Sequence, residues 1–190
     1  MQILQSVGRI RLALVAFLTP SLVAGQVDAA REAYFRAVAE YFSMTAAEVS
    51  ILSEWSLPAE EVPVVLFVAR RAGVSPDALV ALRRSGSGWA RLTRQYHLDA
   101  GHFHVPLTAT ADRGRLSAAY ERFAAVPPDQ WDGVSLQDGE IVDLVNLRIV
   151  AQTLRMRPGE VLARASPGVT WVELYGRLVG DADRSLGAGL

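Results

Sequence analysis

The chain has 190 residues, of which 51% are apolar and 21% are charged. This composition argues against intrinsic disorder, and the length suits one domain or two small ones. The absence of Cys excludes disulfide scaffolds, thiol nucleophiles and thiolate zinc sites, and a net charge of −1 argues against a general nucleic-acid binder.

The first 25 residues have the three parts of a secretory signal peptide. Arg9 and Arg11 form a basic region, an apolar run follows at 12–18, and Gly25 precedes the expected cleavage site. The apolar stretch is shorter than the ~20 residues that span a bilayer. We therefore expect a cleaved signal and a periplasmic or extracellular bacterial protein. An uncleaved anchor and a buried first helix are the alternatives.

The rest of the chain is predicted to be helical. Capping residues mark helix starts at Thr45, Ser56 and Ser75, and Pro76 follows the last of these. No long alternating run between turn signals predicts a strand, and residues 99–115 are expected to form a loop with some extended backbone. Helices are expected near 28–43, 46–54, 59–72, 76–84, 89–96, 116–125, 138–154, 158–165 and 170–178.

One part of the sequence recurs after 82 residues. Proline, glycine and tryptophan stand at the same spacing in both copies: Pro76, Gly86 and Trp89, then Pro158, Gly168 and Trp171. Each copy predicts a long apolar helix, a short helix that begins with Pro, a Gly turn and a helix that begins with Trp. Both tryptophans are expected in the core, because so large an apolar face is usually buried.

The repeat defines the expected domain organisation. We call residues 57–98 module one and residues 136–178 module two. Two units are too few for an open solenoid, so we expect an all-α fold with a compact pair of pseudo-symmetric three-helix modules. The remaining segments are expected to be N-terminal helices at 26–56, a linker with loop and helix at 99–135, and a flexible tail at 179–190.

Residues 74–98 of module one resemble a helix-turn-helix of the recombinase or sigma-factor type, with a short helix, a Gly-bearing turn and a second helix. The resemblance implies that the second helix would enter the major groove of DNA, with Arg91 and Arg94 as contacts to bases or phosphates. Glu173 stands in place of Arg91 in module two. A DNA-binding protein, whose apparent signal is its first helix, is therefore one alternative function.

Residues 40–178 as a whole are similar to a group of uncharacterised exported bacterial proteins. The similarity lies in Tyr41-Phe42, the Glu-Glu-Val-Pro-Val-Val helix that starts at Glu60, and the two modules. It implies export and brings no activity with it.

All three histidines of the chain lie within eight residues. His102 and His104 would share a face of an extended segment and could bind Zn²⁺ or Cu²⁺, with His97 or Asp99 as a further ligand. The alternative is a polar loop whose imidazoles cap a helix or face water. A metal-binding protein or an enzyme that uses this segment is the second alternative function. No other convergent set of acid, base and nucleophile is evident, and no organic cofactor is implied.

Module one has a surplus of arginine over acidic residues. Its six arginines predict an electropositive face that binds an anionic macromolecule or envelope protein: Arg70, Arg71, Arg83, Arg84, Arg91 and Arg94. The alternative is a set of solvated helix ends favoured by the helix dipole. The sequence thus favours an exported, non-catalytic helical protein that binds a macromolecule or has a structural role at the cell envelope.

Overall fold

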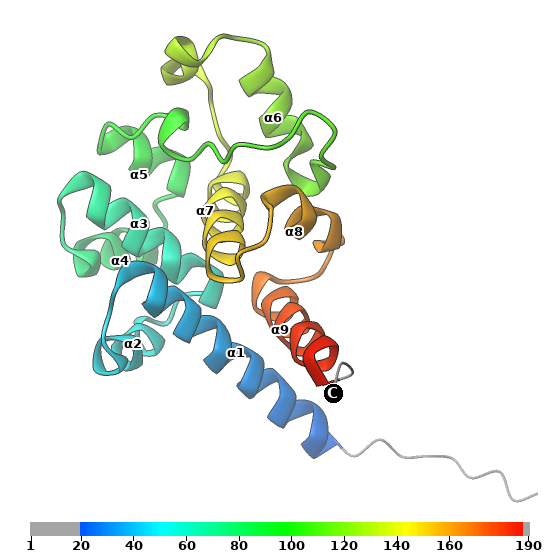
Figure 1. The fold of residues 1–190 in the computed structure, drawn as a ribbon. Helices are drawn as coiled ribbons and strands as arrows, with labels where there is room; N and C mark the ends of the chain where they lie inside the picture. The colour runs from blue at the N-terminus through cyan, green and yellow to red at the C-terminus, as the bar shows by residue number, and fades with distance from the viewer. Residues whose placement is uncertain (1–19, 188–190) are drawn as a thin grey trace, which may run out of the picture.

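The computed structural model describes residues 20–187, and this part of the chain contains helices and no β-strand (Figure 1). The all-α fold predicted from the sequence is confirmed. The α-helices are α1 (Pro20–Phe42), α2 (Ala46–Leu52), α3 (Val62–Ala72), α4 (Pro76–Arg84), α5 (Trp89–Gln95), α6 (Ser117–Ala124), α7 (Asp138–Thr153), α8 (Pro158–Arg164) and α9 (Trp171–Gly187). The 3₁₀ helices are η1 (Ser53–Trp55), η2 (Ala59–Glu61), η3 (Ala100–His102), η4 (Gly114–Leu116) and η5 (Pro128–Gly133).

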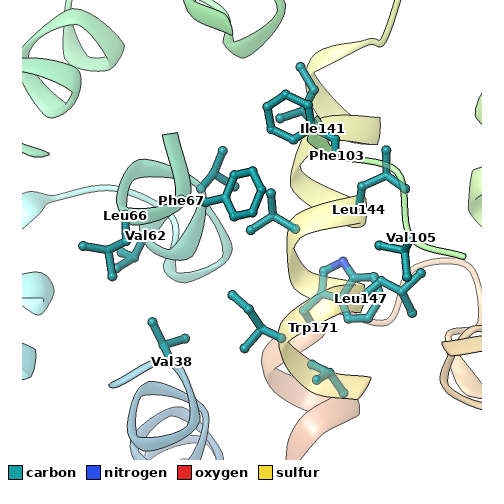
Figure 2. Close-up of a cluster of buried hydrophobic side chains, with 14 of the residues drawn as sticks. Val38, Val62, Leu66, Phe67, Phe103, Val105, Ile141, Leu144, Leu147 and Trp171 are labelled. Atoms are coloured by element: carbon teal, nitrogen blue, oxygen red, sulfur yellow. The ribbon is translucent and has the colours of Figure 1, made fainter. Parts of the chain in front are cut away.

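Helix α7 lies at the centre of the molecule, with α3, α4 and α5 to one side and α8 and α9 to the other (Figure 1). Apolar residues point from it in several directions, as expected of a helix that is surrounded by others. Figure 2 shows Ile141, Leu144 and Leu147 of α7 in one buried cluster with Phe67 of α3 and Trp171 of α9. The two modules therefore share a single core.

One polar side chain is fully buried in α7, and its hydrogen-bonding groups are used. The Asn146 amide oxygen accepts a hydrogen bond from the Tyr34 hydroxyl. Its Nδ2 donates to the carbonyl oxygens of Glu60 (2.9 Å) and Val142 (2.8 Å). Because burial of an amide is costly unless it is hydrogen-bonded, this network favours one arrangement of α1, η2 and α7.

Helices α1 and α9 pack closely where their side chains are small. A Cβ added to Gly176 would lie 2.8 Å from the Cβ of Ala30. The glycine therefore lets the two helix backbones approach, and the N-terminal part of α1 lies beside the C-terminal part of α9 (Figure 1).

The repeated segments have the same local conformation. Helices begin at Pro76 and Pro158, and later at both tryptophans, with left-handed glycines between them at Gly86 (φ 91°) and Gly168 (φ 81°). The turn after the long helix also matches, because Gly73 (φ 67°) and Arg155 (φ 52°) are both left-handed. These equivalences cover the local backbone, and the superposition of whole modules stays a prediction.

The ends of the chain differ from the expected organisation. Helix α9 continues to Gly187, so most of the segment predicted as a tail is helical. Its apolar face extends beyond residue 178 to Val179, which packs against the core. Helix α1 begins at Pro20, so the expected cleavage site after Gly25 falls inside a helix. The preceding part of the predicted signal peptide, residues 1–19, lies outside the described residues.

Candidate functional site

The two repeat tryptophans are buried and held by carboxylates in the same way. Trp89 is 0% exposed and Trp171 is 1% exposed, which confirms both as core residues. The indole Nε1 of Trp89 donates to Glu61 Oε2 (3.2 Å), and that of Trp171 donates to Asp143 Oδ1 (2.7 Å). The two acids occupy equivalent positions of the repeat. The tryptophans thus serve the packing of both modules.

A guanidinium completes each tryptophan site. Arg83 forms a bidentate pair with Glu61, at 2.7 and 2.8 Å, and its Cζ lies 5.0 Å from the ring centroid of Trp89. In module two Arg115 from η4 has its Nη1 3.5 Å from Asp143 Oδ1, and its Cζ lies 5.4 Å from the indole ring. Pairing and stacking on an indole are both suited to the planar guanidinium. We interpret both clusters as structural anchors.

Each module also caps the tryptophan helix of the other. A Glu60 carboxylate oxygen accepts a hydrogen bond from the backbone N–H of Trp171, at the start of α9. Asp138, at the start of α7, accepts one from the N–H of Ala90 in α5 (2.8 Å). A Cβ added to Gly88 would lie 2.6 Å from Asp138 Oδ2, so this glycine makes room for the carboxylate.

The acids around Trp171 have shifted pKa values. Burial raises the pKa of Glu60, although hydrogen bonds from the backbone of Trp171 and Val172 oppose the shift. Burial also raises the pKa of Asp143, against the indole hydrogen bond and the charge of Arg115. Repulsion from Asp143 further raises the pKa of Glu60, and repulsion from Glu140 further raises the pKa of Asp143. Protonation is therefore easier here than at an exposed carboxyl group.

The arginines of module one do not form one uniform set. Arg83 departs from the expected exposed basic pair, because its side chain is only 17% exposed and is engaged by Glu61. The other five are exposed: Arg70, Arg71, Arg84, Arg91 and Arg94. None of these five has an ion pair with another described residue. They come from the ends of α3 and α4 and from α5, and their gathering on one face stays a prediction.

Two arginines from different modules share the ring of Phe67. The Cζ of Arg71 in α3 lies 4.7 Å from the ring centroid, and the Cζ of Arg148 in α7 lies 5.3 Å from it. Arg148 Nη2 donates to the backbone oxygens of His104 (2.8 Å) and His102 (3.2 Å). Its Nε is buried and has no hydrogen-bond partner in the described part of the chain. Two guanidiniums thus lie near one ring, and neither forms an ion pair with a described residue.

The first two histidines have separate surroundings. His97, just after α5, is exposed, and its backbone has a left-handed conformation (φ 56°). His102 is half-buried, and its Nδ1 lies 2.9 Å from Asp99 Oδ1, which also accepts its backbone N–H at 3.3 Å. Asp99 therefore acts as the cap of η3 and fixes the His102 ring.

The third histidine is packed among aromatic rings. The ring centroid of His104 lies 4.2 Å from that of Trp131, 4.8 Å from that of Phe123 and 5.7 Å from that of Tyr120. Burial lowers its pKa, and the charge of Arg148 lowers it further. No group of three His, Asp or Glu side chains within residues 20–187 is arranged to hold a metal ion. The metal site predicted from His97, His102 and His104 is therefore not assembled.

Sequence reasoning missed Arg148, whose guanidinium lies near the same Phe67 ring as that of Arg71 in the other module. It stands within an apolar helix, as a lone charged residue between Leu147 and Ile149. A cation at such a position is a usable signal, because burial of an isolated charge is costly. The position of Arg148 in the sequence does not reveal which residue it contacts, since its contact with Phe67 depends on how α3 packs on α7.

Comparison with known proteins found no match for this chain among family models, curated proteins or solved structures. Among the helices that the structure describes, none combines the length and the apolar character that a membrane span requires.

Proposed function

We propose that the protein is exported and binds an anionic macromolecule at the cell envelope through the exposed arginines of module one, without catalysing a reaction. The observation that supports this proposal is a set of five exposed arginines that form no ion pair within residues 20–187: Arg70, Arg71, Arg84, Arg91 and Arg94. Arginine suits this role, because its planar fork matches the oxygens of phosphate, sulfate and carboxylate groups.

The acids of module one do not balance these charges. Glu61 is paired with Arg83, and Glu60 is directed to the start of α9. Asp77 is left, in the first turn of α4, while Arg84 is in the last turn of the same helix. The positive potential of the module is therefore not cancelled locally. Such a surface attracts polyanions, and its binding weakens with salt because exposed charges are screened over ~8 Å at physiological ionic strength.

Export is tested by finding the mature protein. The full chain is expressed in a bacterium, and the mass and N-terminal sequence of the exported product are measured. Loss of about 25 residues is expected from the signal-peptide pattern. Retention of the full-length chain in the cytoplasm would overturn export and favour the alternative of a buried first helix.

Binding is tested with a double charge reversal. Arg84→Glu with Arg91→Glu should weaken binding to long-chain polyphosphate at least tenfold in 0.1 M salt. The matched control reverses Arg164 and Arg177, two exposed arginines of module two, and changes the net charge equally. It should alter the affinity less than threefold. Equal losses in both variants would mean that net charge alone, and not module one, governs binding.

DNA binding is the second candidate, and the geometry of α4 and α5 favours it. A turn with left-handed Gly86 joins the two helices, and both Arg91 and Arg94 of α5 are exposed. Location in the cytoplasm and binding to duplex DNA that is lost on Arg91→Gln with Arg94→Gln would support it. Export and failure to retard DNA at low salt would reject it.

A further inference from the structure

We propose that Arg71 and Arg148 form a binding site for a tetrahedral oxyanion, such as a phosphate group, beside the ring of Phe67. This inference deepens the proposed function, on which it rests for the nature of the partner, by naming the chemical group that is bound and a residue outside module one. The two guanidiniums come from the last turn of α3 and from the middle of α7.

The first argument is the lack of a counter-charge. Neither Arg71 nor Arg148 forms an ion pair with any described residue. The charges that act on Arg148 are those of Arg71 and of the hydroxyl groups of Tyr41 and Tyr120, with no carboxylate among them. Burial lowers the pKa of Arg148, and the neighbouring Arg71 lowers it further. An anion close to both cations would favour their charged forms and so offset both effects on the pKa of Arg148.

The second argument is the unused hydrogen-bonding capacity. A guanidinium has five N–H donors, and Arg148 uses its Nη2 for hydrogen bonds to two backbone oxygens. Its Nε is buried without a partner, and Arg71 makes no hydrogen bond to the described residues. The hydroxyl of Tyr41 is also without such a bond. The guanidinium of Arg71, the Nη1 of Arg148 and the hydroxyl of Tyr41 are therefore the donors that we assign to the oxygens of a bound oxyanion.

The third argument is the way in which Phe67 orients the pair. Its ring is buried, contacts Phe103 and lies within 5.4 Å of both guanidinium carbons. A cation over an aromatic face keeps its charge and its donors, so stacking fixes the guanidinium plane and leaves its edge for a ligand. Stacking thereby prepares the site, although it does not neutralise it.

The experiment uses the full-length protein and inorganic phosphate as the probe. Isothermal titration calorimetry is done at constant ionic strength, with chloride as the replaced anion. Arg71→Gln should weaken phosphate binding at least tenfold. Arg164→Gln is the control, because it removes the same charge from an exposed arginine of module two that lies outside the proposed binding surface. It should change the affinity less than twofold.

A second variant tests the other half of the site. Arg148→Lys keeps the positive charge and removes the fork, and it should weaken phosphate binding by a similar factor. Its melting temperature is measured in parallel, since Arg148 also holds the backbone of η3 and the following residues. Absence of phosphate binding in the wild-type protein, or equal losses in Arg164→Gln and Arg71→Gln, would overturn the site.

Vesicles distinguish the source of the phosphate group and separate this proposal from the preceding one. Cosedimentation is measured with phosphatidylglycerol vesicles and with phosphatidylcholine vesicles as the neutral control. Binding of free phosphate that depends on Arg71, without binding to anionic vesicles or polyphosphate, would support the site and overturn macromolecular binding. Binding to anionic vesicles or polyphosphate that survives Arg71→Gln would support the proposed function and overturn the oxyanion site.

Discussion

The carboxylate of Glu60, next to the long helix of module one, caps the helix that begins at Trp171 in module two. The reverse contact runs from Asp138 of module two to the N–H of Ala90 in module one. Each module therefore stabilises the start of the other module's last helix. Because the core is also continuous through α7, we expect the two modules to unfold in a single transition.

Asp138→Ala should lower the free energy of unfolding by about 1 kcal/mol, in the range of ~0.5–2 kcal/mol found for lost helix caps. Helix α5 has no capping side chain of its own, so the backbone N–H of Ala90 would lose its partner. Urea unfolding followed by circular dichroism gives the value. Asp77→Ala removes an exposed acid from the first turn of α4 and serves as the control, with a smaller loss.

Trp89→Ala and Trp171→Ala should each lower the free energy of unfolding by about 3–5 kcal/mol, as for other large aromatic residues in a core. Each change leaves a cavity and a carboxylate without its indole donor. Chemical denaturation gives both values. A loss under ~1 kcal/mol for either variant would contradict its place in the core.

Helix starts were the part of the fold that the sequence predicted best, because Pro, Gly and capping residues act locally. Pro76, Trp89 and Pro158 all stand at the starts predicted for them. The end of α9 was missed, since Gly180 and the acids after it weaken the helical pattern. Packing against α1 compensates for that weakness.

The candidate site was less predictable, because neighbouring residues of one type have different tertiary surroundings. Arg83 and Arg84 look alike in the sequence, yet one faces Glu61 and the other is exposed. His104 belongs to a polar-looking loop, and the rings that enclose it, such as that of Trp131, come from a later segment. No local rule predicts such contacts.

Substitution of two glycines in α9 should have opposite effects. Gly176→Ala should destabilise the protein by about 1–3 kcal/mol, because its Cβ would lie 2.8 Å from that of Ala30. Gly180→Ala is the control in the same helix, where an added Cβ meets nothing within 4 Å. It should stabilise the protein by about 0.5–1 kcal/mol through helix propensity. Thermal unfolding of both variants shows whether each substitution raises or lowers the stability of the protein.

The raised pKa values of Glu60 and Asp143 should each contribute stability to the folded state as the pH falls below neutral. A carboxyl group whose pKa is higher in the folded state binds its proton first in that state. Its stabilising contribution is complete below the unfolded values, 4.5 for Glu60 and 3.8 for Asp143, and is lost as the pH rises through the raised folded values.

His104 should reduce the stability of the protein as the pH falls, because its pKa in the folded state is lowered from 6.5 and its proton therefore binds more easily to the unfolded state. The informative quantity is therefore the difference in unfolding free energy between the wild type and Asp143→Asn, in which the effect of His104 cancels. This difference should shift in favour of the wild type from pH 7 to pH 5. A constant difference over that range would contradict the raised pKa of Asp143.

Arg83 and Arg84 should separate stability from binding. Arg83→Gln should lower the free energy of unfolding by about 1–3 kcal/mol, because it leaves the half-buried carboxylate of Glu61 with the Trp89 indole but without its cation, and removes the cation over Trp89. Arg84→Gln should change stability by less than ~0.5 kcal/mol, since it alters an exposed side chain that has no ion pair with a residue of the described chain. Arg84→Gln should instead weaken binding to polyphosphate. Arg83→Gln should melt at a lower temperature than the wild type and still bind polyphosphate below that temperature. Measurement of the melting temperature and the polyphosphate affinity on the same samples tests both halves, and a loss of affinity confined to Arg83→Gln would reject the assignment of Arg84 to the binding surface.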